Sequence, residues 1–366
     1  MATNTPHSVR SARRCNARSA VSKFLFVTAV AIATCTALAL SGVLNAGPAL
    51  AHATGPAAPQ AAGVSGKSYG YPVKPFDRVH FVRANLGDPR MQFHGPPTED
   101  TLMHGSGQFL FHEGVDISAH PGTAVYPVLD GTVTEITWER VRVDSNNGRA
   151  FEYFHIHALV RMGQHVTARQ TVLGRVMRPS NHVHLTEYDG GRFVNPLTPG
   201  RLTPYYDSTT PTVRGIILRQ PGSAREVLPN FVRGRVEIVA DAEDEPNLAG
   251  RLWHGPVTPA LVTWQIRNAA GRVIMRRTAA DFRRSIPSDA AFWRIYARGT
   301  YQNQNVFGRH YSYQQRGTYL FELASGFNTR SLRDGVYDLT VTASDIRGNS
   351  GSQTLRFTVH NRRGWS

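Results

Sequence analysis

FHEGVDIS (residues 111–118) and NHVHL (residues 181–185) are the two stretches that decide how the rest of the chain is interpreted. The first places a histidine, His112, four residues before a carboxylate, Asp116. The second places two histidines two residues apart, and in a β-strand such residues point to the same face. Two imidazoles and one carboxylate make a three-ligand zinc set that leaves a fourth position for water, as in hydrolytic zinc sites. The two stretches therefore predict a metal-dependent hydrolase.

The sequence around these stretches has the pattern of an all-β domain. From Tyr71 onward, short apolar runs alternate with turn signals at roughly the spacing expected of short strands, about every ten residues. We find no convincing amphipathic helix in this region, so the pattern predicts antiparallel sheet. The strands are expected at 124–129, 132–138, 151–160, 171–177, 182–188 and 192–194.

Three motifs follow one another in a characteristic order. HEGVDI at 112–117 is followed by PGTAVY at 121–126 and DGTV at 130–133, YFHI stands at 153–156, and HVHL at 182–185 precedes NPL at 195–197. Together they resemble the lysostaphin-type (LytM-like) zinc metallopeptidases. The resemblance implies a compact antiparallel β-domain of the duplicated hybrid motif type, with the metal at the floor of a groove.

The resemblance also implies roles for individual residues. His112, Asp116 and His184 fall on the family's Zn²⁺ ligands, and His155 and His182 fall on its two catalytic histidines. No residue is expected to bind any other cofactor. The family's enzymes cut peptide bonds in peptidoglycan stem peptides or cross-bridges, using a water that the metal activates. In such a mechanism one histidine takes the proton of the water and another stabilises the oxyanion.

Three neighbouring residues leave alternatives open. His157 would share a strand face with His155, so either could be the catalytic histidine, although the Tyr-x-His-Ile spacing favours His155. Glu113 would be turned away from His112 by strand alternation and is left out of the site. Glu187 is expected to face solvent rather than to support the metal ligands.

The N-terminal segment has the layout of a secretory signal. Five basic residues precede an uncharged, mostly apolar run at 24–44, and Ala49-Leu50-Ala51 matches the small-x-small cleavage pattern. We expect a signal peptide at 1–51, cleaved near Ala51, and an Ala/Pro/Gly-rich linker at 52–69. The alternative is an uncleaved membrane anchor, because about 20 apolar residues can span a bilayer. The expected location is secreted or in the cell envelope, with the membrane contacted only transiently.

The composition restricts the partners. The chain has 41 basic and 26 acidic residues, and removing the five basic residues of the leader leaves 36 against 26. Almost all of the basic residues are arginine and they are evenly spread, with no basic run interleaved with aromatics, so no nucleic-acid partner is expected. Both cysteines, Cys15 and Cys35, fall in the leader, so a processed chain would hold metal only through His, Asp or Glu.

The last part of the chain is predicted to be a separate domain. A zinc metallopeptidase domain is expected at 70–206 and an immunoglobulin-like β-sandwich of accessory role at 207–366, because apolar and alternating runs recur there. An aromatic-rich segment at 296–330 either packs on the sandwich or binds wall material. The acidic run of Asp241, Glu243, Asp244 and Glu245 is expected to be a solvated loop, with a calcium site as the alternative.

Two functions from different classes remain open on the sequence. The first is a zinc endopeptidase acting on peptidoglycan. The second is a catalytically silent protein of the cell envelope that binds wall or regulates another hydrolase. The sequence leaves the oligomeric state and the bond cleaved undetermined.

Overall fold

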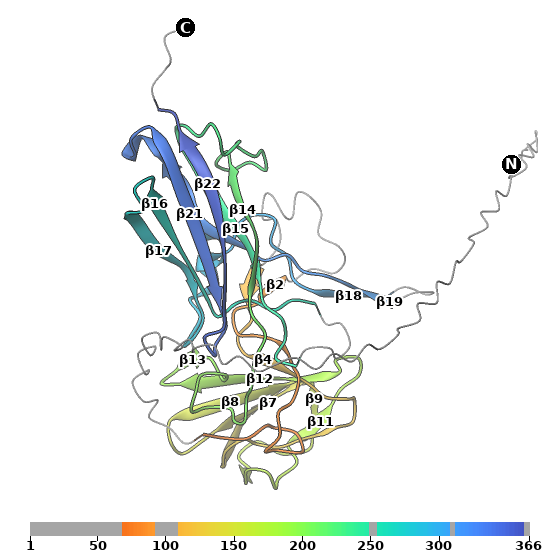
Figure 1. The fold of residues 1–366 in the computed structure, drawn as a ribbon. Helices are drawn as coiled ribbons and strands as arrows, with labels where there is room; N and C mark the ends of the chain where they lie inside the picture. Colours follow the sequence, from red (N-terminus) through yellow and green to blue (C-terminus); the bar gives the residue numbers. More distant parts are fainter. Residues whose placement is uncertain (1–67, 92–108, 249–254, 308–311, 362–366) are drawn as a thin grey trace, which may run out of the picture. The chain divides into compact units, whose positions relative to one another are not determined.

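The computed structural model describes residues 68–91, 109–248, 255–307 and 312–361, and these form a structure built almost entirely of antiparallel β-strands (Figure 1). The predicted all-β class is therefore confirmed. The predicted signal peptide, its cleavage position, both cysteines and most of the linker lie outside the described residues. Within the described ranges, no helix is long and apolar enough to cross a membrane.

The largest sheet contains the two motif stretches from which the sequence was interpreted. Its strands follow the order β1-β4-β12-β8-β7-β6-β10, with β13 paired to the outer part of β12. The strands are β1 (Val82–Ala84), β4 (Val115–Ser118), β6 (Gly131–Ile136), β7 (Arg140–Asp144), β8 (Arg149–Phe154), β10 (His165–Val166), β12 (His182–Asp189) and β13 (Arg192–Val194).

The alternation of side chains along β12 explains which of its faces carries the histidines. Val183 and Leu185 are fully buried and belong to the hydrophobic core of this part of the chain. His182 and His184 alternate with them and therefore lie on the opposite face of the strand. The core thus fixes which face of the sheet carries the histidines.

A small second sheet of three strands changes one sequence-based expectation. It consists of β5 (Ala124–Val125), β11 (Gly174–Val176) and β9 (Ile156–Ala158) in that order across the sheet, with β11 in the middle. The prediction of one continuous strand over 151–160 is wrong, because β8 ends at Phe154 and β9 begins at Ile156 in a different sheet. His155 between them has a positive φ of 62°, a conformation that no strand residue adopts.

Residues 212–359 form two sheets that share one hydrophobic core. One sheet contains β14 (Thr212–Arg219), β15 (Arg235–Glu243) and β20 (Leu320–Asn328); the other contains β17 (Val273–Asp281), β16 (Leu261–Asn268), β21 (Gly335–Ser344) and β22 (Ser350–Val359). Core side chains come from both sheets, as in a β-sandwich. The expected closing hairpin is present as β21 and β22 (Figure 1). An immunoglobulin-like relationship stays a prediction.

Short elements complete this region. They are the helical turns η1 (Asp289–Ala291), α2 (Phe292–Ile295) and η2 (Thr329–Ser331), and the hairpin of β18 (Gln304–Phe307) and β19 (Ser312–Gln315). The sequence did not indicate the helical segment at 289–295. The aromatic residues Tyr296, Tyr319 and Phe321 of the aromatic-rich segment are buried in the sandwich core, as the packing alternative requires.

Two short paired strands, which lie just before the HEGVDI motif in the sequence, pack into the sandwich core. The strands β2 (Pro89–Met91) and β3 (Phe109–Phe111) pair with each other, and Met91, Phe109 and Phe111 belong to the same hydrophobic cluster as the sandwich. The backbone N–H of Phe111 donates to Oδ1 of Asp289 at 2.9 Å. Because His112 follows directly, the sandwich anchors the chain that delivers the first motif histidine.

Candidate metal centre and active site

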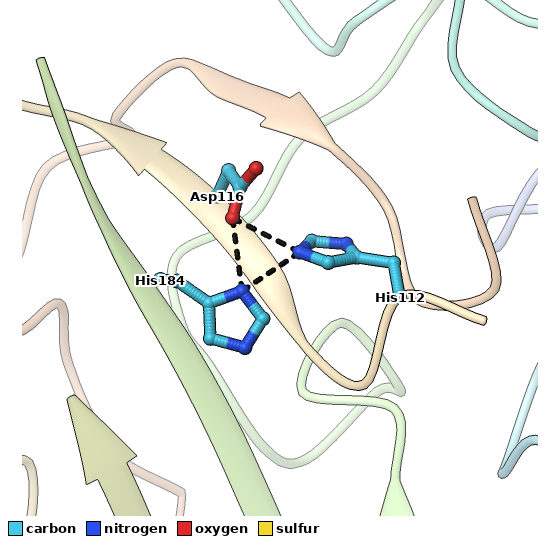
Figure 2. Close-up of side chains that lie close together, drawn as sticks. All are labelled: His112, Asp116 and His184. Atoms are coloured by element: carbon cyan, nitrogen blue, oxygen red, sulfur yellow. Dashed lines mark hydrogen bonds and ion pairs between the residues drawn. The ribbon is translucent and has the colours of Figure 1, made fainter. Parts of the chain in front are cut away.

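His112, Asp116 and His184 present three donor atoms to one point (Figure 2). The Nε2 atom of His112 lies 3.0 Å from Oδ1 of Asp116 and 2.7 Å from Nδ1 of His184, and Nδ1 of His184 lies 3.0 Å from the same carboxylate oxygen. All three come from the two motif stretches, 72 residues apart at the furthest. The structure thus brings together the residues that the resemblance implied as metal ligands.

Strand pairing and one glycine produce this convergence. In the antiparallel pair of β4 and β12, Asp116 lies directly opposite His184, and directly opposed residues have neighbouring side chains on one face. Gly114 lets the chain from His112 pass close to β12: a Cβ at this position would lie 2.2 Å from the Leu185 carbonyl oxygen and 3.0 Å from Nε2 of His184. Any side chain at position 114 would displace the centre.

Hydrogen bonds behind the two histidines determine which ring nitrogen keeps its proton. Nδ1 of His112 lies 2.8 Å from the carbonyl oxygen of Asn85, which can only accept, so His112 carries its proton there and has a lone pair at Nε2. Nε2 of His184 lies 2.7 Å from the hydroxyl of the fully buried Thr186. Donating to that hydroxyl leaves a lone pair on Nδ1 of His184, the atom that faces the other two ligands.

Burial keeps the side chains in the protonation states that a metal ion would require. Burial and then the positive charge of Arg90 lower the pKa of His112 to about 3, so this imidazole is neutral at pH 7. Burial by itself raises the pKa of Asp116, but the neighbouring histidines outweigh it and hold the pKa well below its usual range. Arg90 also binds the other oxygen of Asp116, with Nη2 3.2 Å from Oδ2, which leaves Oδ1 to the two histidines.

The two predicted catalytic histidines lie beside this centre. Nε2 of His182 is 3.6 Å from Oδ1 of Asp116, and its Nδ1 is hydrogen-bonded to the Ser180 carbonyl. The ring of His155 lies against that of His182, with 4.7 Å between the centroids. Nδ1 of His155 is 3.0 Å from Oε2 of Glu139. Both rings therefore have Nδ1 occupied from behind and Nε2 available.

A pocket of about 260 Å³ contains the whole set of predicted site residues. Its lining includes both predicted catalytic histidines and all three predicted ligands, but His157 is absent from it. His157 lies on β9, in the small sheet, and is exposed. The positive φ of His155 breaks the strand between the two histidines and turns only His155 to the pocket.

Several residues of the pocket carry no signal that sequence reasoning used. Arg83 of β1 and Arg90 of β2 precede the first motif, and Gln302 and Asn303 belong to the last part of the chain, yet all four line the pocket. Glu139 lies in a turn and His155 lies at the end of a strand. Their separation in the sequence matches no characteristic spacing that would have predicted the contact. Thr186, which does not line the pocket, was also missed, although its position two residues after His184 on one strand is a signal that could have placed it on the same face.

The expectation that Glu187 faces solvent is wrong. Glu187 is fully buried, and its carboxylate accepts hydrogen bonds from Arg149 at 2.8 Å, from the Tyr69 hydroxyl at 2.5 Å and from Arg201. The same alternation that places His184 at the centre directs Glu187 to the opposite, core-facing side of β12. Two arginines and a hydroxyl balance the carboxylate there.

Comparison with known proteins assigns a class to this site. Residues 110–196 match Peptidase family M23, and this range includes all five predicted site residues. Residues 110–196 therefore form a peptidase family M23 domain, and the peptidases of this family are metal-dependent. No curated protein matches the chain.

Several solved structures are similar to part of the chain. The SpoIIQ–SpoIIIAH pore-forming complex matches with 20% identity over 36% of this chain and 89% of its own, at a TM-score of 0.27. The M23 metalloprotease pseudoalterin, from the deep sea, matches with 16% identity over 37% and 78%, at 0.26. A zinc-containing peptidase from Vibrio cholerae matches with 20% identity over 33% and 40%, at 0.23.

Proposed function

We propose that this protein is an exported zinc endopeptidase that hydrolyses peptide bonds in peptidoglycan stem peptides or cross-bridges. The observation that carries the proposal is the convergence of three donor atoms within 3.0 Å of one another in a pocket that also holds two histidines. The proposed location, secreted or in the cell envelope after cleavage near Ala51, rests on the sequence of the leader.

The donor set fits a zinc ion. Two neutral imidazoles and one carboxylate are common ligands of catalytic Zn²⁺, and three protein ligands leave a position open. The Asn85 carbonyl behind His112 and the Thr186 hydroxyl behind His184 are the kind of outer partners that orient metal-binding histidines. A proton between Nε2 of His112, Oδ1 of Asp116 and Nδ1 of His184 would form a hydrogen bond between only two of these atoms. A cation can bind all three at once. Zinc bound there supplies Lewis acidity, which polarises a carbonyl and lowers the pKa of water towards about 7.

The two catalytic histidines accept or donate protons through their Nε2 atoms. The Ser180 carbonyl accepts the Nδ1 proton of His182, which leaves a lone pair on Nε2 to take a proton from water. The carboxylate of Glu139 behind His155 stabilises that ring when it is positively charged, as the buried carboxylate of a catalytic triad does. His155 is therefore suited to donate from Nε2 to an oxyanion, which is where negative charge develops in peptide hydrolysis.

Arg83 favours a substrate that carries carboxylates. Its guanidinium lines the pocket and makes no hydrogen bond or ion pair with any described residue. Arginine binds carboxylates with two parallel hydrogen bonds. Peptidoglycan peptides carry free carboxylates along the stem, so Arg83 supplies a contact of the appropriate charge for this class of substrate.

A catalytically silent, wall-binding or regulatory protein is the second candidate. The contact of Arg90 with Asp116 favours it, because a guanidinium at a ligand carboxylate competes with a cation for negative charge. The two candidates differ in one observable, which is turnover of purified wall.

The test pairs metal content with hydrolysis in the full chain. We expect one zinc per chain by mass spectrometry and release of soluble muropeptides from purified sacculi by the parent protein. His184→Ala should lose both, whereas the control His157→Ala, which alters a histidine outside the pocket, should keep both. Zinc without release from any sacculus preparation would refute the enzyme in favour of the silent protein. Release that persists in His184→Ala would refute the ligand assignment.

A further inference from the structure

A second cluster of ionisable side chains lies away from the pocket. Asp207 belongs to the segment that joins β13 to β14, Asp244 directly follows β15, and Asp345 begins the turn between β21 and β22. One carboxylate oxygen from each lies within 4.8 Å of the other two. Asp244 and Asp345 are only 2% and 4% exposed. Three carboxylates so close together and shielded from water would repel one another strongly if all were ionised.

No described basic group neutralises this cluster. None of the three carboxylates forms an ion pair within the described part of the chain. The guanidinium of Arg347, two residues after Asp345, donates instead to the carbonyl oxygen of Tyr205 at 3.0 Å and lies over the Tyr205 ring. Burial, and then the charges of Asp207 and Asp345, raise the pKa of Asp244 to about 9. The cluster therefore lacks a positive charge.

One oxygen of the cluster also lacks a hydrogen-bond partner. Oδ1 of Asp244 accepts from the backbone N–H of Glu245 at 2.9 Å, but Oδ2 is buried without any partner in the described ranges. A buried carboxylate oxygen without a partner is costly, and native proteins almost always satisfy such atoms. The three acids therefore differ from an ordinary solvated acidic loop, in which water would satisfy Oδ2.

The other two carboxylates are held in place from behind. Oδ1 of Asp345 accepts from the backbone N–H groups of Arg347 at 2.8 Å, Gly348 at 2.6 Å and Asn349 at 2.9 Å. Asp207 accepts from the Tyr205 hydroxyl at 3.0 Å and from the Thr209 hydroxyl at 2.6 Å. The oxygens are thus fixed before any ligand arrives, which lowers the entropic cost of binding one.

We infer that Asp207, Asp244 and Asp345 bind a calcium ion. Calcium takes oxygen ligands at 2.3–2.6 Å, so two oxygens on opposite sides of one ion are at most about 4.6–5.2 Å apart, and the observed spacing of up to 4.8 Å falls in this range. The set has carboxylates and no imidazole or thiolate, which favours a hard cation over zinc. The ion supplies the missing charge and a partner for Oδ2 of Asp244.

The ligands are not the acidic run at 241–245, for which the sequence predicts a solvated loop, with a calcium site only as the alternative. Asp241 and Glu243 lie on β15 and pair with Arg214, and Glu243 also pairs with Arg316. Of the acidic run, only Asp244 has its carboxylate in the cluster. Its two partners lie 37 residues before it and 101 residues after it, counted from their residue numbers, 207, 244 and 345.

The position of the site gives the ion a structural task. The cluster joins the segment that leaves the M23 domain to two loops of the sandwich, and Asn349 already donates to the Asp207 carbonyl at 3.1 Å. Binding to the folded state alone raises stability by mass action. Calcium should therefore stabilise this junction without taking part in peptide hydrolysis.

The test measures calcium binding in the full chain with zinc kept saturated and no chelator present. We expect millimolar calcium to raise the Tm of the parent. We also expect terbium, used as a luminescent calcium substitute, to be sensitised by Tyr205 and displaced by calcium. Asp244→Asn should lose the Tm response and weaken terbium binding by roughly tenfold or more, because ligand charge sets calcium affinity. Asp338→Asn, at a half-buried acid of β21 that pairs with Arg356, is the matched control and should respond like the parent.

Folding of the variant is checked by its behaviour without calcium. Asparagine cannot ionise and so adds no charge to the buried cluster, and Asp244→Asn should then be at least as stable as the parent. Asp345→Asn provides a second variant with the same expected loss of response. A parent with no calcium-dependent rise in Tm and no terbium signal would overturn the inference, as would an equal response in Asp244→Asn. Zinc content and muropeptide release test the M23 site separately, so failure of one proposal leaves the other intact.

Discussion

At the scale of single residues, each histidine of the centre is defined by the group behind it. His112 contacts the backbone carbonyl of Asn85, and His184 contacts the hydroxyl of Thr186. His182 contacts the backbone carbonyl of Ser180, and His155 contacts the carboxylate of Glu139. Each contact sets the position of one proton and leaves the other nitrogen for chemistry. The proposed function would therefore depend on residues that contact neither the metal nor the substrate.

Thr186 tests this dependence most directly. Thr186→Val keeps the shape of a fully buried side chain but removes the acceptor for the Nε2 proton of His184. We expect zinc affinity to fall by roughly 10- to 100-fold, as for other outer partners of metal ligands, measured by competition with a chromophoric chelator. The control Thr186→Ser retains the hydroxyl and should bind zinc nearly as well as the parent. Equal affinity in all three proteins would refute the role given to this hydrogen bond.

At the scale of elements, a strand break separates the two candidate catalytic histidines, His155 and His157. A continuous strand would place His155 and His157 on the same face, so alternation could not separate them. The chain instead leaves the large sheet after β8 and enters the small sheet as β9, with His155 at a φ of 62°. Such a conformation is strained for a residue with a side chain and is typical of functional sites.

The two histidines give a matched pair of variants. His155→Gln should lower kcat by roughly 10²- to 10⁴-fold, the usual contribution of a positioned acid or base, while zinc content stays at one per chain. His157→Gln should keep both kcat and zinc content, because His157 is exposed on β9 and absent from the pocket. Hydrolysis of sacculi and mass spectrometry provide the measurements. The reverse pattern would move the catalytic role to His157.

At the scale of the whole molecule, the described residues fall into one compact unit with two main hydrophobic cores. Phe111 belongs to the sandwich core although it lies directly before His112, and it packs against Phe282, Phe292 and Tyr296. The sandwich thus anchors the residue that directly precedes the predicted ligand His112. Gln302 and Asn303 from the same part of the chain also line the pocket.

Phe111 links stability to the metal centre. Phe111→Ala should reduce the free energy of unfolding by about 3–5 kcal/mol, the cost of removing a buried phenylalanine, measured by denaturant unfolding with tryptophan fluorescence. It should also weaken zinc binding, because His112 loses its anchor. The control Phe231→Ala removes a phenylalanine that is 52% exposed and should cost about 1 kcal/mol or less. Similar losses in both variants would contradict the coupling.

The sequence by itself determined the local properties of this protein. The spacing of His182 and His184, the apolar residues between them and the turn signals predict a strand with both histidines on one face, because side chains alternate with a period of two. The motif resemblance named five residues, and the structure brings all of them to one pocket. Only the tertiary structure decided which further groups join them.

The residues that could not be predicted are those with distant partners. The placement of Arg83 and Arg90 in the pocket, the burial of Glu187 between Arg149 and Arg201, and the meeting of Asp244 with Asp207 and Asp345 all depend on strand pairing and on packing between sheets. Alternation carries information over a few residues along one strand. Alternation gives no information about which strand will pair with which. Strand pairing depends on the burial of the whole hydrophobic surface at once.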